Sequence, residues 1–479
     1  MTKSIFIHGM ILSVAFTGLG CGGAGTESAS GEQTANTESA LSSGCKLDKE
    51  TRFFIPPPDP GAVKQIAALI KARDLKNAAR ITAMVTTPQA VWFTDGTPKE
   101  VEKSVKKTMA AAALEKRVPV LVAYNVPFRD CAQYSGGGAV DTAAYKAWIA
   151  AFAKGIGQGK AVVILEPDSL GIIPYNTTIY GATEWCQPTV TATDGTVTPA
   201  PGATPDERYA QLQYAAQSLG ARAPNASVYL DGTHSAWLGV GEAAFRIHKA
   251  GTDPVSGASL AKGFYVNASN FQSTEQSIQF STWVSMCTAF ATNADEGGWR
   301  LGNFGWCASQ YNPDTGYSVD YTPEYVATVT AQIQGLMGNA VATLPFVVDT
   351  SRNGKGPLDV SPYAATPYNQ PASVISSLSA GNWCNPPGAG LGLRPTATTG
   401  VPLVDAYLWV KTPGQSDGTC DIAGGARGWD YTQYNPWSIS GDEAQKHFDP
   451  LWGRVDPAAG SWFAAQALDL AKNASPPLF

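Results

Sequence analysis

Residues 161–168 read AVVILEPD, an apolar run of strand length that ends at two acidic residues. The run does not alternate with polar residues, as a strand with one solvated face would, so it is typical of a parallel strand covered on both faces. Four other apolar runs end in the same way, at residues 118–124, 227–230, 344–348 and 404–410. The chain therefore repeats one pattern at five places.

The side chains that follow these runs are polar or charged. They are Asn125, Arg129 and Asp130; Glu166 and Asp168; Asp231 and His234; Asp349 and Arg352; and Lys411 and Asp417. Each acidic residue could simply cap the helix that follows it, but five such ends favour a shared cleft. Ala-rich, helix-like stretches lie between the runs, at 100–116, 141–154 and 206–219. This alternation predicts an α/β fold, a barrel of parallel strands with its site at the carboxyl ends of the strands.

Composition excludes several classes of protein. The 479 residues carry 33 Lys and Arg against 39 Asp and Glu, and only 15% of them are charged. Such a chain has no basic stripe for phosphates, so we expect no nucleic-acid partner. With 44% hydrophobic residues it can build a large core, which excludes a wholly disordered chain.

The amino-terminal segment predicts export. Residues 1–20 combine Lys3, an apolar stretch and small residues before Cys21, as in a signal peptide. The sequence before Cys21 resembles a bacterial lipoprotein cleavage box, so the protein is either secreted or anchored at the bacterial cell surface by a lipid on Cys21. Residues 21–44 are mostly small and polar and predict a flexible tether. Residues 45–479 predict a single domain.

The eight cysteines are widely spaced, and none forms a CxxC pair. In an exported protein this pattern favours disulfides over a zinc site. We prefer the pairs Cys131–Cys186, Cys287–Cys307 and Cys384–Cys420, although spacing alone does not fix the connectivity. Cys45 would then be spare if Cys21 is lipidated or removed.

The inventory of reactive side chains favours glycoside hydrolysis. The chain has only four His and contains no GxSxG, HExxH or nucleotide-binding glycine motif, so we expect neither a metal nor a cofactor. Convergent carboxylates supply an acid and a group that handles water. Aromatic rings offer flat apolar faces to a sugar.

Several blocks, in order, resemble the signatures of glycoside hydrolase family 6. They are residues 123–131 (AYNVPFRDC), 164–170 (ILEPDSL), 229–239 (YLDGTHSAWLG), 383–385 (WCN), 405–419 (DAYLWVKTPGQSDGT), 455–463 (VDPAAGSWF) and 473–478 (NASPPL). The resemblance spans residues 45–479. It implies a distorted, incomplete α/β barrel that hydrolyses β-1,4-glucan with inversion of configuration, without a cofactor.

The resemblance implies the catalytic roles. Asp168 matches the general acid, which must keep a proton near neutral pH and so needs a raised pKa. Asp130 matches a second carboxylate that raises the pKa of the acid and joins the proton network to water. Alternatively, Asp130 only pairs with Arg129 or Arg352.

Three further residues match the family site. Asp417 corresponds to the candidate base, although a water chain to Asp130 could take that role instead. Asp231 corresponds to an acidic residue that either contacts the substrate or supports the hydrogen-bond network. Tyr124 corresponds to the tyrosine that crowds the sugar being cleaved; otherwise it is a core residue at a strand end.

The binding residues implied by the resemblance are aromatic and polar. Trp92 and Trp383 match stacking residues on the non-reducing side, and Trp237 matches one on the leaving-group side. The polar sugar contacts are His234, Asn267, Asn270 and Lys411.

The chain departs from the family pattern at Gln415, where the family usually has Glu, so a charged sugar contact becomes neutral. Insertions at 175–205 and 423–450 either roof the cleft or hang outside it. We expect a monomeric, exported cellulase that acts on β-1,4-glucan, cutting within the chain. The alternatives are a cellobiohydrolase with a loop-enclosed tunnel and a surface glucan-binding protein without catalysis.

Overall fold

Seven parallel strands form one curled sheet in the computed structural model, which describes residues 47–366, 368–420, 448–449, 452 and 454–479. The predicted export signal and tether, together with Cys21 and Cys45, lie outside the described residues. Within those residues, no helix has the length and apolar character that a membrane crossing requires.

The sheet runs through its strands in chain order. The strands are β1 (Val91–Phe93), β2 (Val120–Ala123), β3 (Ala161–Leu165), β6 (Ala226–Asp231), β7 (Gly263–Val266), β10 (Phe346–Asp349) and β11 (Val404–Leu408). Every neighbouring pair is parallel. All five predicted strands are present, and β1 and β7 are additional.

The two edge strands approach each other without forming a ladder. The Ala90 amide donates to the Trp409 carbonyl at 2.9 Å, and Trp92 Nε1 donates to the Val410 carbonyl at 2.8 Å. No strand pairing joins β1 to β11 in the described part of the chain. The prediction of an incomplete barrel is therefore confirmed.

Successive side chains of each strand enter different cores. In β3, Val163 packs in the layer between sheet and helices, whereas Val162 and Ile164 pack inside the curl of the sheet. Because both faces are buried, the strand sequences are continuously apolar.

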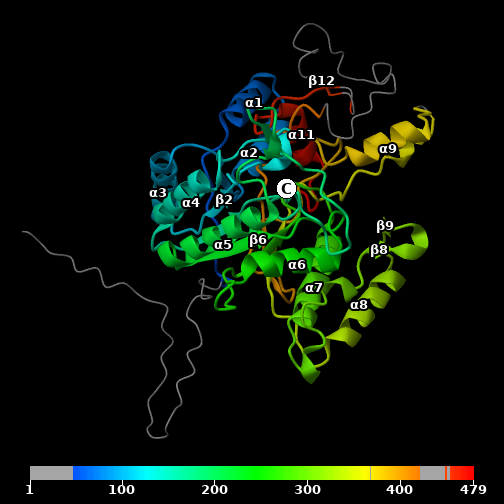
Figure 1. Ribbon diagram of the computed structural model, residues 1–479. Helices are drawn as coiled ribbons and strands as arrows, with labels where there is room; N and C mark the ends of the chain where they lie inside the picture. Colours follow the sequence, from blue (N-terminus) through cyan, green and yellow to red (C-terminus); the bar gives the residue numbers. More distant parts are fainter. Residues whose placement is uncertain (1–46, 367, 421–447, 450–451, 453) are drawn as a thin grey trace, which may run out of the picture. The chain divides into compact units, whose positions relative to one another are not determined.

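Helices surround the sheet (Figure 1). They are α1 (Pro60–Lys71), α2 (Leu75–Val85), α3 (Pro98–Leu114), α4 (Thr142–Ile156), α5 (Pro205–Arg222), α6 (Val240–Gly251), α7 (Thr274–Ala291), α8 (Pro323–Met337), α9 (Ala372–Ala380) and α11 (Ala464–Lys472). Helices α1 and α2 pack against α11, so the two ends of the described domain lie side by side (Figure 1).

The helix starts follow the capping chemistry in the sequence. Thr97 and Glu100 form a capping box at the start of α3, and Thr204 and Glu207 form another at α5. In each helix a Pro occupies the first turn, where its missing N–H has no partner to lose.

Short hairpins and 3₁₀ turns lie in the loops. The hairpins are β4 (Thr189–Thr191) with β5 (Val197–Pro199), β8 (Tyr311–Asn312) with β9 (Ser318–Val319), and β12 (Phe448–Asp449) with β13 (Arg454–Val455). The 3₁₀ turns are η1 (Asp130–Ala132), η2 (Glu296–Gly298), η3 (Phe304–Trp306), η4 (Pro313–Thr315) and η5 (Ser361–Ala364).

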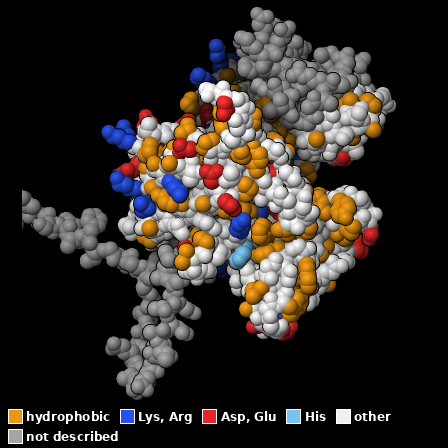
Figure 2. Space-filling model, viewed as in Figure 1, with side chains coloured by type: hydrophobic (Ala, Val, Ile, Leu, Met, Phe, Trp, Pro, Cys, Tyr) orange, Lys and Arg blue, Asp and Glu red, His pale blue; other side chains and the backbone are white. Residues whose placement is uncertain are grey.

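Three disulfides are present: Cys131–Cys186 and Cys384–Cys420 join loop segments to each other, and Cys287–Cys307 joins a loop to α7. These are the preferred pairs, so the predicted connectivity is confirmed. Basic side chains gather over α3 (Figure 2), where Glu102 pairs with Lys106 and Lys154.

Candidate active site

A cavity of about 960 Å³ lies at the carboxyl ends of the strands and collects most of the predicted site residues. Those that line it are Trp92, Tyr124, Asp130, Asp168, His234, Trp237, Asn270, Trp383, Lys411, Gln415 and Asp417. Trp92 lies in β1 itself, and the others come from the loops after β2, β3, β6, β7 and β11 and from the 383–385 segment. The cleft expected from the strand ends is therefore present.

The turn after β3 projects Asp168 into this cavity. Glu166 and Asp168 both have positive φ, at 51° and 64°, which is uncommon for residues other than glycine. Glu166 is fully buried, and its Oε2 accepts the Asn125 amide at 2.7 Å and the Val126 amide at 2.8 Å. Glu166 thus ties the loop after β2 to the turn that carries Asp168.

The surroundings of Asp168 favour the protonated form of its carboxyl. Burial is the main cause of a pKa well above the usual range for Asp, and the negative charges of Asp231 and Asp130 raise it further. Lys411 acts in the opposite direction but does not offset these effects. A carboxylic acid that stays neutral near pH 7 can donate a proton to a leaving oxygen.

Asp130 lies in the same cavity and is held by its own loop. Its Oδ2 accepts the Ser135 amide at 2.8 Å, and burial raises its pKa to about 6. In the part of the chain that the structure describes, no ion pair joins Asp130 to Arg129 or Arg352. Arg129 instead donates to the Ser135, Thr94 and Tyr124 carbonyls. The alternative of a purely structural ion pair is therefore not supported.

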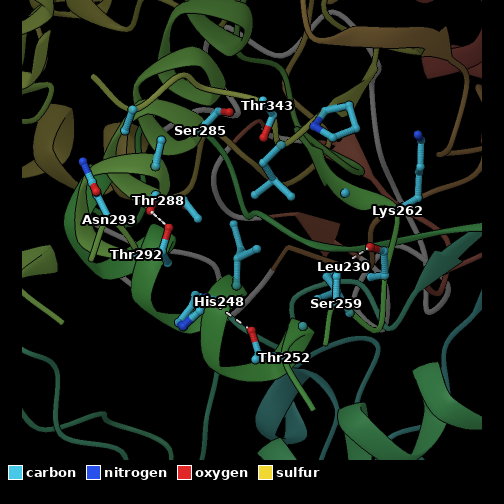
Figure 3. Close-up of a pocket in the computed structure, with 18 of the residues that line it drawn as sticks. Leu230, His248, Thr252, Ser259, Lys262, Ser285, Thr288, Thr292, Asn293 and Thr343 are labelled. Atoms are coloured by element: carbon cyan, nitrogen blue, oxygen red, sulfur yellow. Dashed lines mark hydrogen bonds between the residues drawn. The ribbon is translucent and has the colours of Figure 1, made fainter. Parts of the chain in front are cut away.

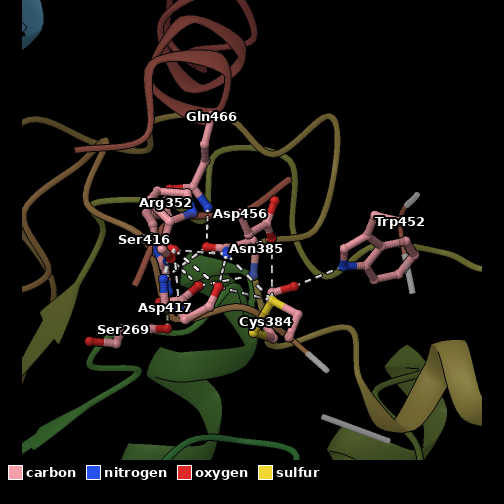
Figure 4. Close-up of a disulfide and its surroundings, with 12 residues drawn as sticks. Ser269, Arg352, Cys384, Asn385, Ser416, Asp417, Trp452, Asp456 and Gln466 are labelled. Carbon is pink, nitrogen blue, oxygen red and sulfur yellow. Dashed lines mark hydrogen bonds and ion pairs between the residues drawn. A yellow bond between two sulfur atoms is a disulfide. The ribbon is translucent and has the colours of Figure 1, made fainter. Parts of the chain in front are cut away.

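Asp417 is held by two cations, and Figure 4 shows one of them, Arg352, beside it. Arg352 Nη1 lies 2.9 Å from Oδ1 and 2.7 Å from Oδ2, and Lys411 Nζ lies 3.1 Å from Oδ1. The Asn385 amide donates to Oδ2 at 3.0 Å. Burial alone would raise the pKa of Asp417, but the charges of Arg352 and Lys411 lower it below the usual value.

Three predicted or candidate polar residues lie behind the cavity wall. Asp231 is 2% exposed and accepts the Leu170, Gly171 and Thr233 amides, so it supports the hydrogen-bond network and acts on Asp168 through its charge. Asn267 is fully buried and donates to the Gln272 and Asp349 carbonyls. Neither Asp231 nor Asn267 is among the residues that line the cavity, and the contacts of Asp231 match the second of its two expected roles, support of the hydrogen-bond network. Asp349 likewise accepts loop amides, those of Ser269, Ser351, Val410 and Lys411.

Aromatic side chains line both sides of the carboxylates. Trp92 meets Tyr124 edge to face, with ring centroids 5.4 Å apart. Tyr124 is 6% exposed, and that exposed part faces the cavity. Trp237 lies 5.6 Å from the His234 ring, and burial lowers the pKa of His234 to about 4. Since His234 Nδ1 accepts the Ala236 amide, the neutral ring carries its proton on Nε2, where it can donate to a hydroxyl.

The departure at Gln415 has a structural counterpart. Gln415 Nε2 donates to Asp59 Oδ2 at 3.2 Å, across 356 positions of sequence. A Glu at this position would place a carboxylate beside Asp59, so the neutral amide fits its neighbour.

Sequence reasoning missed two aromatic residues of the cavity. Trp185 comes from the insertion at 175–205, so part of that insertion lines the cleft. Tyr134 lies 6.2 Å from the Trp383 ring. The signal was the adjacent disulfide, since Cys131 and Cys186 anchor these two segments to each other. Most of the second insertion lies outside the described residues.

A second cavity of about 690 Å³ has a different character (Figure 3). It lies between α6, α7 and the amino-terminal ends of β7 and β10. Hydroxyl and aliphatic side chains dominate it, and none of the described residues that line it is Asp, Glu, Trp or Tyr. It therefore offers neither a proton donor of the Asp168 kind nor a ring on which a sugar could stack.

Nothing in the described ranges resembles a metal centre, because no group of three or more His, Cys, Asp or Glu is arranged to hold an ion. The site is instead a carboxylate cleft with aromatic walls in an incomplete parallel barrel. This combination defines the class of polysaccharide-cleaving glycoside hydrolases.

The comparisons with known proteins agree. Residues 48–474 match the model for glycosyl hydrolases family 6. Endoglucanase 1 from Streptomyces halstedii is 32% identical over 377 residues, which cover 78% of this chain and 84% of that protein. Endoglucanase 1 from Streptomyces sp. (strain KSM-9) is also 32% identical, and the match spans 70% of this chain but 65% of that protein. The chain belongs to glycosyl hydrolases family 6.

Solved structures share the fold. The endoglucanase Cel6 from Mycobacterium tuberculosis, solved with methyl-cellobiosyl-4-deoxy-4-thio-β-D-cellobioside, has a TM-score of 0.52 and 26% identity and covers 91% of this chain and 98% of its own. The catalytic core of the cellobiohydrolase Cel6A from Chaetomium thermophilum, at 22% identity and a TM-score of 0.53, covers 92% of this chain and 100% of its own, and shows the same fold.

Proposed function

We propose that the protein hydrolyses β-1,4-glucosidic bonds of cellulose or a related β-glucan by single displacement. The observation that carries the proposal is that Asp168 and Asp130 line one cavity and that both have raised pKa values. The causes differ, because the negative charges of Asp231 and Asp130 add to the effect of burial on Asp168, whereas the Ser135 amide and Arg129 act against the shift of Asp130. Two carboxyl groups with separated pKa values supply an acid and a proton acceptor at one pH.

In the proposed reaction, Asp168 donates its proton to the glycosidic oxygen while the bond from that oxygen to the anomeric carbon breaks. A water molecule attacks the anomeric carbon from the opposite face and loses a proton. The products are two shorter glucans, one with a new reducing end of inverted configuration. Tyr124 crowds the ring being cleaved, and its buried phenol stays neutral because its pKa is raised.

We assign the final acceptance of the water proton to Asp130, through an intervening water. Asp417 already binds Arg352 and Lys411, and its lowered pKa makes it a weak base. Asp130, with a pKa of about 6, is ionised at neutral pH and more basic. Asp417 then serves as a fixed negative charge that holds the two cations.

The substrate lies along the aromatic walls in this proposal. Trp92 and Trp383 stack sugars on the non-reducing side, and Trp237 stacks those on the leaving-group side. His234, Asn270, Lys411 and Gln415 bond to hydroxyl groups. Internal cleavage is favoured by the two relatives named as endoglucanases at 32% identity. A cellobiohydrolase is the second candidate, because a relative at 28% identity carries that name.

Hydrolysis of a soluble, substituted cellulose tests the proposal and separates the candidates. Rapid loss of viscosity indicates internal cleavage, whereas cellobiose release without viscosity loss indicates action from an end. If the protein causes neither viscosity loss nor cellobiose release, it is a glucan-binding protein without catalysis, and the proposal is overturned.

We further propose that the protein is exported and acts as a monomer. Three disulfides favour an oxidising compartment. Mass spectrometry of the protein purified from its host separates a lipid on Cys21 from plain secretion, and sedimentation measures the oligomeric state.

A further inference from the structure

Four exposed aromatic side chains continue outward from the leaving-group end of the cavity. They are Trp185, Tyr180, Trp306 and Trp299, with exposed fractions of 56%, 58%, 58% and 40%. We call them the outer aromatic row. Large exposed rings held in one place are unusual on a soluble protein and mark interaction surfaces.

The row is continuous with the cavity. Trp185 lines the cavity, and Tyr180 lies at the tip of the hairpin that precedes Trp185, closed by the Thr177–Thr183 bridge. A Cβ on Gly241 would lie 2.7 Å from the Tyr180 hydroxyl and 2.4 Å from the Phe304 carbonyl. The hairpin tip and η3 therefore meet over the first turn of α6, four residues after Trp237.

Trp306 and Trp299 complete the row. A Cβ on Gly305 would lie 3.8 Å from the Tyr180 ring, which is van der Waals contact. Trp306 is the next residue in the chain, so it lies close to Tyr180. The Trp306 and Trp299 ring centroids lie 5.8 Å apart. Arg300 stacks over the Trp299 ring at 4.2 Å and supports it.

The segments that carry these rings are held firmly. Glu242 Oε2 accepts the Ile179 amide at 2.8 Å, and the fully buried Arg246 pairs with Glu242 at 2.6 Å and Glu184 at 3.5 Å. Trp185 precedes Cys186, and Trp306 precedes Cys307, so each of these exposed rings is next to a disulfide. Rigid rings lose little conformational entropy when a ligand binds.

We propose that the outer aromatic row binds the stretch of β-1,4-glucan that extends beyond the leaving-group end of the cavity. This proposal rests on the proposed function for the identity of the polymer. Flat rings match the C–H faces of successive glucose units. The row is formed by uncharged rings, and Glu184, Glu242 and Glu296 on or beside its segments each pair with an arginine. A neutral polymer fits such a surface better than a charged one.

The test compares binding in the Asp168→Asn background, in which bound glucan should persist. Tyr180→Ala/Trp306→Ala is added to that background, and migration is measured by affinity electrophoresis through gels containing hydroxyethylcellulose. We expect about tenfold weaker retention from the loss of two stacking faces. Calorimetry with cellotetraose should give equal affinities, because a short chain is held by the cavity.

Two controls keep the test specific. Tyr180→Phe/Trp306→Tyr retains both ring faces and should retain most of the binding. Leu114→Ala removes another exposed apolar side chain, 87% exposed on α3, and should change nothing. Melting temperatures show whether each variant is folded. If the double variant is unfolded, the single variants Tyr180→Ala and Trp306→Ala replace it in the retention measurement.

The proposal would be overturned if the Asp168→Asn protein were retained equally with and without Tyr180→Ala/Trp306→Ala. It would also be overturned if the double change weakened the binding of cellotetraose as much as the retention by the polymer. A change in sedimentation without a change in retention would also overturn it, because the row would then join copies of this chain. If the wild-type protein hydrolyses no β-glucan but the row variants lose retention, the proposed function fails, whereas the proposal that the outer aromatic row binds glucan is supported.

Discussion

Arg352 Nη1 contacts both carboxylate oxygens of Asp417, at 2.9 Å and 2.7 Å. Both groups are buried, so this ion pair is shielded from solvent and costly to break. Asp130, by contrast, forms no ion pair among the described residues and accepts the Ser135 amide at 2.8 Å. Because Asp417 is bound by cations and Asp130 is not, we assign Asp417 the role of a fixed charge and Asp130 that of the proton acceptor.

Asp168→Asn should lower the rate of cleavage of unactivated β-glucan by about 10²–10⁴-fold, because an amide cannot donate the proton that the leaving oxygen needs. Binding of cellotetraose should remain, since the amide keeps the size of the carboxyl. The rate is measured by reducing-end release and the affinity by calorimetry. Asp359→Asn, at an exposed carboxylate that does not line the cavity, is the matched control. Wild-type rates in Asp168→Asn would contradict the assignment.

Asp130→Asn should change the pH profile as well as the rate. The charge of Asp130 raises the pKa of Asp168, so its removal lowers that pKa and moves the alkaline limb of kcat/KM to lower pH. The acidic limb, which reflects ionisation of Asp130 near pH 6, should disappear. An alkaline limb that stays in place would show that the two carboxyl groups do not interact.

Asp130 and Asp417 should have opposite effects on stability. The folded-state pKa of Asp130, about 6, lies above the unfolded value of about 3.9, so its ionisation costs stability as pH rises through that window. Asp130→Asn should therefore raise the free energy of unfolding at pH 7, by about 1 kcal/mol.

The pKa of Asp417 is lowered, so its stabilisation is present above about pH 3.9 and is lost as pH falls through the folded-state value. Asp417→Asn leaves Arg352 buried without a counter-charge and should cost about 3–5 kcal/mol. Urea unfolding at pH 7 measures both variants. A stabilised Asp417→Asn would contradict this account.

Gln415→Glu should destabilise the protein by about 1 kcal/mol, because the new carboxylate would lie beside Asp59. Asp59→Asn should restore stability in the double variant, since Asn can still cap α1. Thermal unfolding of the single and double variants forms the mutant cycle. Additive effects would show that residues 59 and 415 are not coupled.

The fold was predictable where the chain repeats a strong local pattern. The run at 161–165 coincides with β3, because a strand buried on both faces must be apolar throughout. Strand β1 has only three residues, too few for periodicity to distinguish it from loop, and β7 begins with Gly263, a residue type depleted in strands. The incomplete closure depends on Trp92 meeting Val410, a contact across 318 positions that local patterns do not encode.

The residue types of the site were predictable, but the sequence did not show which of these residues line the cavity and which lie behind its wall. Asp231 ends β6 and Asp168 follows β3, yet of the two only Asp168 lines the cavity, because the Leu170, Gly171 and Thr233 amides hold Asp231 behind it. Spacing cannot reveal which carboxylate the loop amides will bind. Trp185 was missed for a related reason, since the direction of an insertion is set by a disulfide and by the buried Arg246 network.

The central claim is that Asp168 and Asp130 act together in a single displacement at the anomeric carbon. Proton NMR of the first product, recorded before mutarotation, tests it most directly. We predict that the newly formed reducing end appears as the α-anomer. A new reducing end released as the β-anomer would contradict the mechanism and the roles of both aspartates.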